Sequence, residues 1–380
     1  MLGTHSFLDG GLKVGVQRMA EGFAERGWTV DYVSTSSSPF DLVGRSRRRR
    51  FKGVWLDGQD RRGVVVAPRL VEYRFKALLP VHRLFVRAPA QLHWFEYLLP
   101  RWIRNKTYSA CLHETTPNVV FFDRARARVN VFRLSDLPEG FLHEMPDAVV
   151  NLFRRHLGMR GYDEVWSVSH SLSEYADRCG YDGPIVEMPN GIDGSFAGIE
   201  KMEQRRRRNS AVFVGGVSHP WVDIDLVERV AGLLPDWVFD LYGTGADGKR
   251  STAPNVRFHS VVSRQAMPAL LAGYEVGLIP FRDLHGRMDY VERPLKFYEY
   301  IAAGLGVVST DVGGLREGMG GLSRFGQDPE SFAAGVLAAR DDGRSRGADF
   351  AKRFATEHSW ESIIERASDR LERLVRDQAV

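Results

Sequence analysis

Short apolar runs alternate with helical patterns along this chain, and the alternation starts afresh after residue 209. Apolar residues at helical spacing run from Val16 to Arg26, Gly27 predicts the end of that helix, and residues 29–33 follow as a strand. Further strands are predicted at 63–67, 109–112, 128–133, 164–169 and 185–188, and then at 210–214, 237–242, 256–259, 276–280 and 306–310. Helices are predicted at 223–234, 264–271 and 295–303. Strands that alternate with helices predict mostly parallel sheets with covered faces.

The predicted fold class is α/β, with two Rossmann-like domains facing a cleft and a C-terminal amphipathic helix packing back across them. A length of 380 residues suits two to three domains. A turn at Pro189-Asn190-Gly191 and a basic run at 205–208 suggest a linker. The predicted parts are an N-terminal domain at 1–188, a linker at 189–209, a C-terminal domain at 210–355 and a helical tail at 356–380. Ser359 would cap the amphipathic helix of the tail. A cleft between two such domains is the expected binding site.

The first strand is too short for this fold class, because the loop Asp9-Gly10-Gly11 follows only eight residues. Either that strand is very short, or the true start of the protein lies upstream of Met1.

Composition excludes several classes of protein. Hydrophobic residues make up 43% and charged residues 26% of the chain, which is globular usage. No run approaches the roughly 18 apolar residues of a membrane-spanning helix, and the first residues lack the pattern of a signal peptide. Cys111 and Cys179, the only two cysteines, exclude a disulfide framework and a zinc site built on cysteine, and they fit a reducing compartment.

One motif in the second half points to a family. The segment Pro-Leu-Lys-Phe-Tyr-Glu-Tyr-Ile-Ala-Ala-Gly at 294–304, followed by the strand at 307–310, resembles the donor-binding helix of GT-B nucleotide-sugar glycosyltransferases. Matching segments lie at 189–193, 213–216 and 358–360, so the likeness covers roughly 185–375. The basic first half and the Arg-Leu-Ser-Asp segment at 133–136 look most like bacterial exopolysaccharide glucuronosyltransferases. The resemblance implies a donor site in the second domain and an acceptor site in the first.

The motif also makes physical sense as a nucleoside diphosphate site. Lys296 and Glu299 are three residues apart and therefore share one helix face. Pro294 suits the first helical turn, whose N–H groups and dipole favour an anion. Lys296 would bind diphosphate oxygens, and Glu299 would accept hydrogen bonds from ribose hydroxyls. The alternative is an exposed Lys–Glu pair on a helix.

Residues near this helix complete the predicted donor site. They are Gly215, Gly216, Phe281, Arg287, Arg293 and Leu295. The two glycines would let backbone N–H groups approach phosphate, whereas Gly243 and Gly245 are interpreted as a turn. The loop at 281–293 carries three arginines, Arg282, Arg287 and Arg293. Three arginines favour a donor sugar with its own carboxylate, such as UDP-glucuronate. The alternative is that the arginines pair with Asp283, Asp289 and Glu292 at the surface.

The predicted reaction is a single displacement with inversion. Many retaining relatives carry two glutamates eight positions apart, whereas Glu292 and Glu299 are seven apart. An inverting enzyme needs a base, and Asp136 follows the strand at 128–133 at the end where α/β sheets bind ligands. The alternative role for Asp136 is a helix cap, because Glu139 lies three residues later. Asp9, Glu114 and Asp147 are lesser candidates for the base, and His5 and His113 are candidates for substrate contact.

The first half has a basic region that suits an anionic partner. Residues 40–110 hold 16 Lys and Arg against 5 Asp and Glu. Aromatic residues are interleaved with these bases, as at an anionic membrane surface. The predicted membrane or acceptor residues are Arg47, Arg48, Arg49, Arg50, Trp55, Trp94 and Trp102. Nucleic acid could attract the same composition, but no recognition motif accompanies it, so no nucleic-acid partner is predicted. The remaining alternative is a solvated loop over core aromatics.

The predicted function is therefore transfer of a sugar, with glucuronate as one donor candidate, from a UDP-sugar to a lipid-linked polysaccharide precursor. The protein would be cytoplasmic and bound to the inner face of the membrane. No divalent metal is expected, and the UDP-sugar is a substrate rather than a cofactor. The alternatives are a sugar-nucleotide epimerase of the same fold and a non-catalytic membrane- or nucleic-acid-binding protein.

Overall fold

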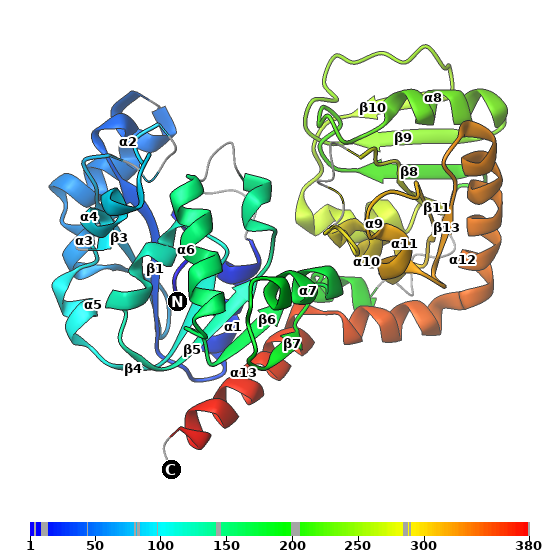
Figure 1. Cartoon of the computed structure of the whole chain (residues 1–380). Helices are drawn as coiled ribbons and strands as arrows, with labels where there is room; N and C mark the ends of the chain where they lie inside the picture. Colours follow the sequence, from blue (N-terminus) through cyan, green and yellow to red (C-terminus); the bar gives the residue numbers. More distant parts are fainter. Residues whose placement is uncertain are drawn as a thin grey trace. The chain divides into compact units, whose positions relative to one another are not determined.

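The computed structural model (Figure 1) describes residues 1–3, 5–8, 14–43, 45–79, 81, 84–96, 98–141, 146–198, 206–283, 288 and 290–378. The chain forms two compact units. Unit 1 comprises Met1–Pro189 and Ile364–Val380, and unit 2 comprises Asn190–Ile363. Each unit is an α/β layer structure built on its own sheet, as the alternating pattern predicts.

The strands of unit 1 follow the order β2-β3-β1 and then β4-β5-β6-β7. Their bounds are β1 (Val30–Ser37), β2 (Val64–Ala67), β3 (Leu70–Lys76), β4 (Tyr108–Glu114), β5 (Ala127–Leu134), β6 (Glu164–Ser167) and β7 (Ile185–Glu187). Only β2 and β3 pair antiparallel. Leu2 joins the two groups, because it forms parallel bridges to Val33 of β1 and to His113 of β4. Leu2 thus lies between β1 and β4 as an isolated bridge, at the place where the short first strand was expected.

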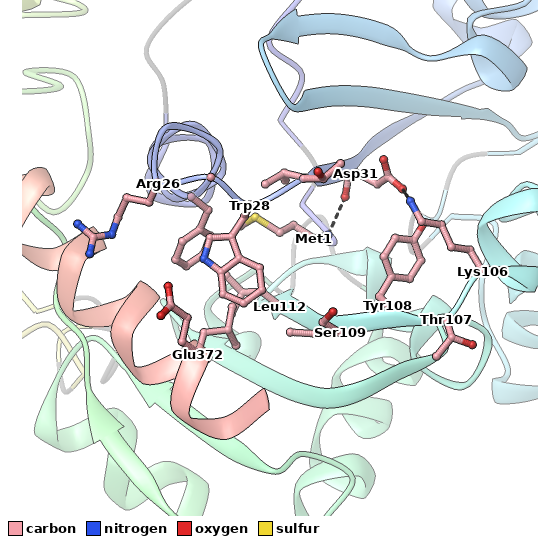
Figure 2. Close-up of a pocket in the computed structure, with 16 residues that line it drawn as sticks. Met1, Arg26, Trp28, Asp31, Lys106, Thr107, Tyr108, Ser109, Leu112 and Glu372 are labelled. Atoms are coloured by element: carbon pink, nitrogen blue, oxygen red, sulfur yellow. Dashed lines mark hydrogen bonds and ion pairs between the residues drawn. The ribbon is translucent and has the colours of Figure 1, made fainter. Parts of the chain in front are cut away.

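A cavity of about 540 Å³ lies beside Met1. Figure 2 shows the cavity walls, which come from the starts of β1 and β4, the end of α1 and helix α13. The Met1 ammonium donates to the Asp31 carbonyl at 2.8 Å, and Lys106 reaches the Asp31 carboxylate at 2.7 Å. The cavity therefore lies where the starts of β1 and β4 meet α1 and α13.

Strand β3 was not predicted, because its inward face carries charged residues. Glu72 and Arg74 are both buried. The Arg74 Nε donates to Glu72 Oε1 at 3.2 Å, and the Ser34 hydroxyl donates to the same oxygen at 2.5 Å. These mutual contacts satisfy groups that an apolar-alternation rule would place at the surface.

Helices cover the sheet of unit 1. They are α1 (Gly15–Glu25), α2 (Arg45–Phe51), α3 (Gln59–Arg62), α4 (Leu92–Glu96), α5 (Arg101–Asn105), α6 (Asp147–Gly158) and α7 (His170–Arg178), with short helical turns η1 (Pro39–Val43), η2 (Lys52–Leu56), η3 (Pro89–Gln91), η4 (Pro117–Arg124) and η5 (Pro138–Phe141). Gly27 ends α1 in a left-handed conformation (φ 97°), as predicted. Helix α13 (Trp360–Asp377), red in Figure 1, is capped by the Ser359 hydroxyl, and from Ile364 onward it belongs to unit 1.

Unit 2 has an all-parallel sheet in the order β10-β9-β8-β11-β12-β13. Its strands are β8 (Ser210–Val214), β9 (Val238–Tyr242), β10 (Val256–His259), β11 (Val276–Ile279), β12 (Gly306–Ser309) and β13 (Ser323–Phe325). Its helices are α8 (Ile224–Leu233), η7 (Arg264–Ala266), α9 (Met267–Leu271), α10 (Leu295–Ala302), α11 (Leu315–Met319) and α12 (Pro329–Glu357), the last broken at Gly347. Sequence patterns missed β13 and α12. Strands β8, β11 and β12 are almost wholly buried, which explains their continuous apolar runs.

Candidate functional site

Helix α10 is fixed on the sheet of unit 2 by Tyr300. The Tyr300 hydroxyl accepts a hydrogen bond from the Val214 N–H, at the end of β8, at 3.0 Å. Its ring packs on Gly277 of β11, where a Cβ would lie 2.2 Å from the ring. The residue before α10 is Pro294, which lies at the N-cap and not inside the first turn. The predicted helix is therefore present, with its first turn beside the ends of β8 and β11.

Lys296 extends from the first turn of α10 into an aromatic setting. Its ammonium lies 4.8 Å from the centre of the Phe281 ring and 5.6 Å from that of Phe213. No hydrogen bond or ion pair of this ammonium is found within the described residues. Burial lowers the pKa of Lys296 to about 8, and the charge of Glu299 only partly opposes the shift. A partly desolvated lysine without a carboxylate partner at a helix N-terminus is suited to bind an anion.

Glu299 lies one turn further along α10 and is 5% exposed. Its Oε1 accepts a hydrogen bond from Arg264 of η7, which leaves Oε2 without a hydrogen bond in the described part of the chain. Burial raises the pKa of Glu299, against the opposing effect of Arg264. The Lys–Glu pair is thus not the exposed pair of the alternative interpretation. Arg264 was not predicted from the sequence, because it lies 35 residues before Glu299 and no local spacing connects the two.

Gly215 and Gly216, which follow β8, differ in their contacts. The Gly215 N–H donates to the Tyr242 carbonyl at 2.9 Å, so this N–H does not have the free donor role that was expected of it. A Cβ at Gly215 would lie 3.6 Å from the Cε of Lys296, so the missing side chain leaves the lysine room. Gly216 packs against His219. Gly243 (φ 142°) allows close approach, because a Cβ there would lie 1.7 Å from the Gly215 carbonyl oxygen.

The loop after β11 holds the other predicted donor residues. Phe281 is buried beneath Lys296, and Leu295 is partly exposed at the start of α10. The Arg293 Nε donates to the Gly318 carbonyl at 2.9 Å. Arg282 reaches the Val222 carbonyl at 3.3 Å and a carboxylate at 3.6 Å. These two arginines therefore have protein partners, but these partners are not the acids that the surface-pairing alternative names, since Arg282 reaches Asp223 and Arg293 reaches a backbone carbonyl. Arg287 and Asp289 lie outside the described residues.

In unit 1, Asp136 follows β5 and keeps solvent access. Partial burial and the charge of Glu114 raise the pKa of Asp136 to about 7, although Arg133 and Ser135 oppose the shift. The helix-cap alternative finds no support, because the Glu139 carboxylate accepts from Arg154 and from the Tyr175 hydroxyl instead. A carboxyl group that titrates near neutral pH is suited to act as a base.

The lesser candidates for the base, and the two histidine candidates for substrate contact, differ from Asp136 in burial and in their partners. Glu114 is buried and paired with Arg133, whose Nη1 reaches its two oxygens at 2.9 and 3.1 Å. Asp147 is exposed at the first turn of α6, and Asp9 lies outside the described residues. Burial lowers the pKa of His113 to about 3, and its ring packs among aromatic residues, so His113 is a core residue. The other histidine candidate, His5, is exposed.

The predicted membrane residues divide into two groups. Arg48 and Arg49 are exposed on α2, Arg50 lies 3.9 Å from a carboxylate, and the side chain of Arg47 is outside the described set. Trp94 is 81% exposed. Trp55 and Trp102 are only partly exposed, because their rings pack on protein aromatics, and their role at a membrane or acceptor surface stays a prediction. Phe40 and Leu42, in the η1 turn that precedes α2, are exposed apolar residues.

The described residues contain neither a metal-binding cluster nor a membrane-spanning helix. No cluster of three or more His, Cys, Asp or Glu residues able to hold a metal ion was found there. No helix in the described part of the chain is both long and apolar enough to cross a bilayer.

Comparison with known proteins identifies the fold. The family described as glycosyl transferases group 1 matches residues 208–342, which is less than half of the chain. No curated protein matches the chain by sequence. Similar solved structures include a sucrose-phosphate synthase from Thermosynechococcus elongatus (16% identity, 99% of each chain covered, TM-score 0.70), HepE of Anabaena in complex with UDP (14%, 98% of each, 0.62) and a trehalose-6-phosphate protein from E. coli bound with UDP-2-fluoro glucose (11%, 98% of each, 0.59). The chain thus has the GT-B fold.

Proposed function

We propose that this protein is a glycosyltransferase that uses a UDP-sugar donor, held by unit 2. The observation that carries this proposal is the ammonium of Lys296, which lies over Phe281 at the first turn of α10 without an ion-pair partner in the described chain. Glu299 follows one turn later with one carboxylate oxygen available for ribose hydroxyls. Two solved structures of the same fold hold UDP or a UDP-sugar analogue, which supports uridine as the base.

We further propose an inverting displacement onto an acceptor hydroxyl with Asp136 as the base. The carboxyl takes the hydroxyl proton as the oxygen attacks the anomeric carbon, and the bond from that carbon to the diphosphate breaks. Lys296 and the N-terminus of α10 stabilise the charge that develops on the diphosphate. The raised pKa of Asp136 supports this role. Glucuronate remains one candidate for the donor sugar, with Arg287 as the arginine to test.

The proposed acceptor is a lipid-linked saccharide at an anionic membrane surface. Support comes from Arg48 and Arg49 on α2, with Phe40 and Leu42 exposed in the preceding η1 turn. The Arg48 Nε donates to the Leu42 carbonyl at 2.8 Å, which brings basic and apolar groups together. Bases attract anionic head groups, and apolar side chains enter the interface.

Calorimetric titration with UDP tests the donor proposal. The Lys296→Gln variant should bind UDP roughly 10- to 100-fold more weakly, because a charge-assisted contact contributes about 1.5–3 kcal/mol. Lys249→Gln is the matched control, since Lys249 also lies over an aromatic ring of unit 2, that of Phe258, at 5.9 Å. Equal UDP affinity in wild type and Lys296→Gln would refute the proposed site. Conversion of a UDP-sugar without any acceptor would indicate an epimerase instead.

A further inference from the structure

Four arginines from two separate segments surround a second cavity in unit 2. Arg206 and Arg208 precede β8, whereas Arg340 and Arg344 lie four residues apart on one face of α12. They line a cavity of about 600 Å³ together with Asn209 and Glu275. We refer to these six residues as the arginine pocket. Five of the six carry charge, and none is aliphatic or aromatic, so the pocket does not suit an apolar ligand.

Several of these side chains are already held in position. Arg206 donates to the Gly304 carbonyl at 2.7 Å and to the Ala303 carbonyl at 2.8 Å. Arg344 donates through Nε to Glu275 at 3.1 Å, and the second Glu275 oxygen accepts from the Asn209 N–H at 2.8 Å. Guanidinium groups fixed in this way lose less side-chain entropy when an anion binds.

Positive charge remains after these contacts are counted. Glu275 is buried and offsets Arg344. Arg340 pairs with Asp341, but that aspartate is 65% exposed and lies outside the cavity lining, so solvent screens the pair. For Arg208 no hydrogen bond or ion pair is found within the described residues. The pocket therefore has a net positive charge and planar donors that fit phosphate oxygens.

The pocket is separate from the proposed donor site. Asn209 and Glu275 directly precede β8 and β11, whereas Gly215 and Phe281 follow the same two strands. A parallel strand rises about 3.3 Å per residue, so the six positions between Asn209 and Gly215 correspond to roughly 20 Å along the sheet. One diphosphate cannot occupy both.

We propose that the arginine pocket binds a soluble phosphorylated small molecule, through a diphosphate or two phosphate groups. Two phosphates carry enough negative charge to match the net charge of the lining. The volume allows for a ligand larger than inorganic phosphate. A phosphate on a lipid head group has the same chemistry, so the test needs an arm for each source.

The test uses inorganic pyrophosphate and the full chain. The Lys296→Met variant removes the donor-site lysine, and it should still bind one pyrophosphate by calorimetry. Adding Arg208→Gln and Arg340→Gln should weaken that binding at least tenfold, because two charge-assisted contacts are lost. Adding Arg250→Gln and Arg257→Gln, two exposed arginines elsewhere in unit 2, is the matched control and should change nothing.

Three outcomes would overturn the proposal: absence of pyrophosphate binding in Lys296→Met, equal binding in the two arginine double variants, or binding to phosphatidate vesicles without binding to free pyrophosphate. Arg206, and neither Arg208 nor Arg340, donates to the Ala303 and Gly304 carbonyls just after α10, so both variants should fold. Replacing Arg208 and Arg340 by Lys keeps the charges and should restore part of the affinity. UDP binding by the wild type is measured separately, so a failure of the donor proposal is distinguishable from a failure here.

Discussion

Arg370 of α13 donates through Nε to both carboxylate oxygens of Glu164, at 3.0 and 2.9 Å, although 206 residues separate the two. Glu164 begins β6 and is fully buried, and it also accepts from the Trp166 indole N–H at 2.6 Å. A buried carboxylate requires such partners, because an uncompensated charge in the interior is costly. This contact fixes the end of the chain on the sheet of unit 1.

Replacing Arg370 by Met should destabilise unit 1. Removing one partner of a fully buried ion pair costs about 3–5 kcal/mol, and the cost here should be smaller because the Arg370 side chain is 34% exposed. Urea unfolding at pH 7 would measure the loss. The control is Arg373→Met, an exposed arginine on the same helix. Equal unfolding midpoints for the two variants would contradict the structural role of the pair.

Lys296→Met should have opposite effects with and without ligand. The pKa of Lys296 is about 8 in the folded protein and 10.5 in the unfolded chain, so the unfolded chain binds more protons between those values. The charged lysine therefore costs stability that is fully present below pH 8 and disappears as pH rises toward 10.5. At pH 7 the variant should melt at a higher temperature than wild type without ligand, and it should gain less from UDP. A lower melting temperature without ligand would show that Lys296 is not desolvated as described.

Glu299→Gln should separate recognition of the ribose from recognition of the diphosphate. An amide keeps an oxygen for Arg264 but accepts more weakly from ribose hydroxyls than a carboxylate does. We expect UDP to bind roughly tenfold more weakly while pyrophosphate affinity at the donor site is unchanged. Calorimetry with both ligands, in a background that carries the Arg208→Gln and Arg340→Gln changes, would isolate the donor site. Equal losses for the two ligands would argue against ribose contact.

Transfer activity should depend on the protonation of Asp136. A base must be deprotonated, so kcat/KM should rise with pH through about 7 and then level off. The Asp136→Asn variant should lose activity at least 100-fold and lose this inflection. Asp147→Asn is the control, since Asp147 is an exposed acid in the first turn of α6. A pH profile that keeps its inflection near 7 in Asp136→Asn would point to another base.

The membrane proposal predicts weaker vesicle binding when charge is removed from α2. Each base near an anionic surface contributes about 1 kcal/mol, so Arg48→Gln with Arg49→Gln should lower partitioning roughly 30-fold. Co-sedimentation with phosphatidylserine vesicles would measure this. Arg250→Gln with Arg257→Gln removes the same charge from unit 2 and should have little effect. Trp94→Ala should also weaken binding, because its ring is 81% exposed. Equal partitioning of both double variants would exclude α2 as the docking surface.

Sequence patterns predicted most strands because apolar runs such as β8 and β11 are buried on both faces. They missed β3, whose buried Glu72 and Arg74 look like surface residues until tertiary partners are known. Local spacing likewise predicted that Lys296 and Glu299 share a helix face. It could not reveal Arg264, which reaches Glu299 from a different element, or the arginine pocket, whose members come from three distant segments.

The sequence by itself determined the α/β class, the helix α10 and the capped terminal helix, because these depend on periodicity and on residues a few positions apart. Only the tertiary structure decided which polar and charged groups have partners within the protein. In the folded chain the Gly215 N–H donates to the Tyr242 carbonyl and Arg293 donates to the Gly318 carbonyl, whereas the Lys296 ammonium lies over an aromatic ring. Desolvation and long-range pairing depend on which segments meet in space, and one-dimensional spacing does not encode that directly.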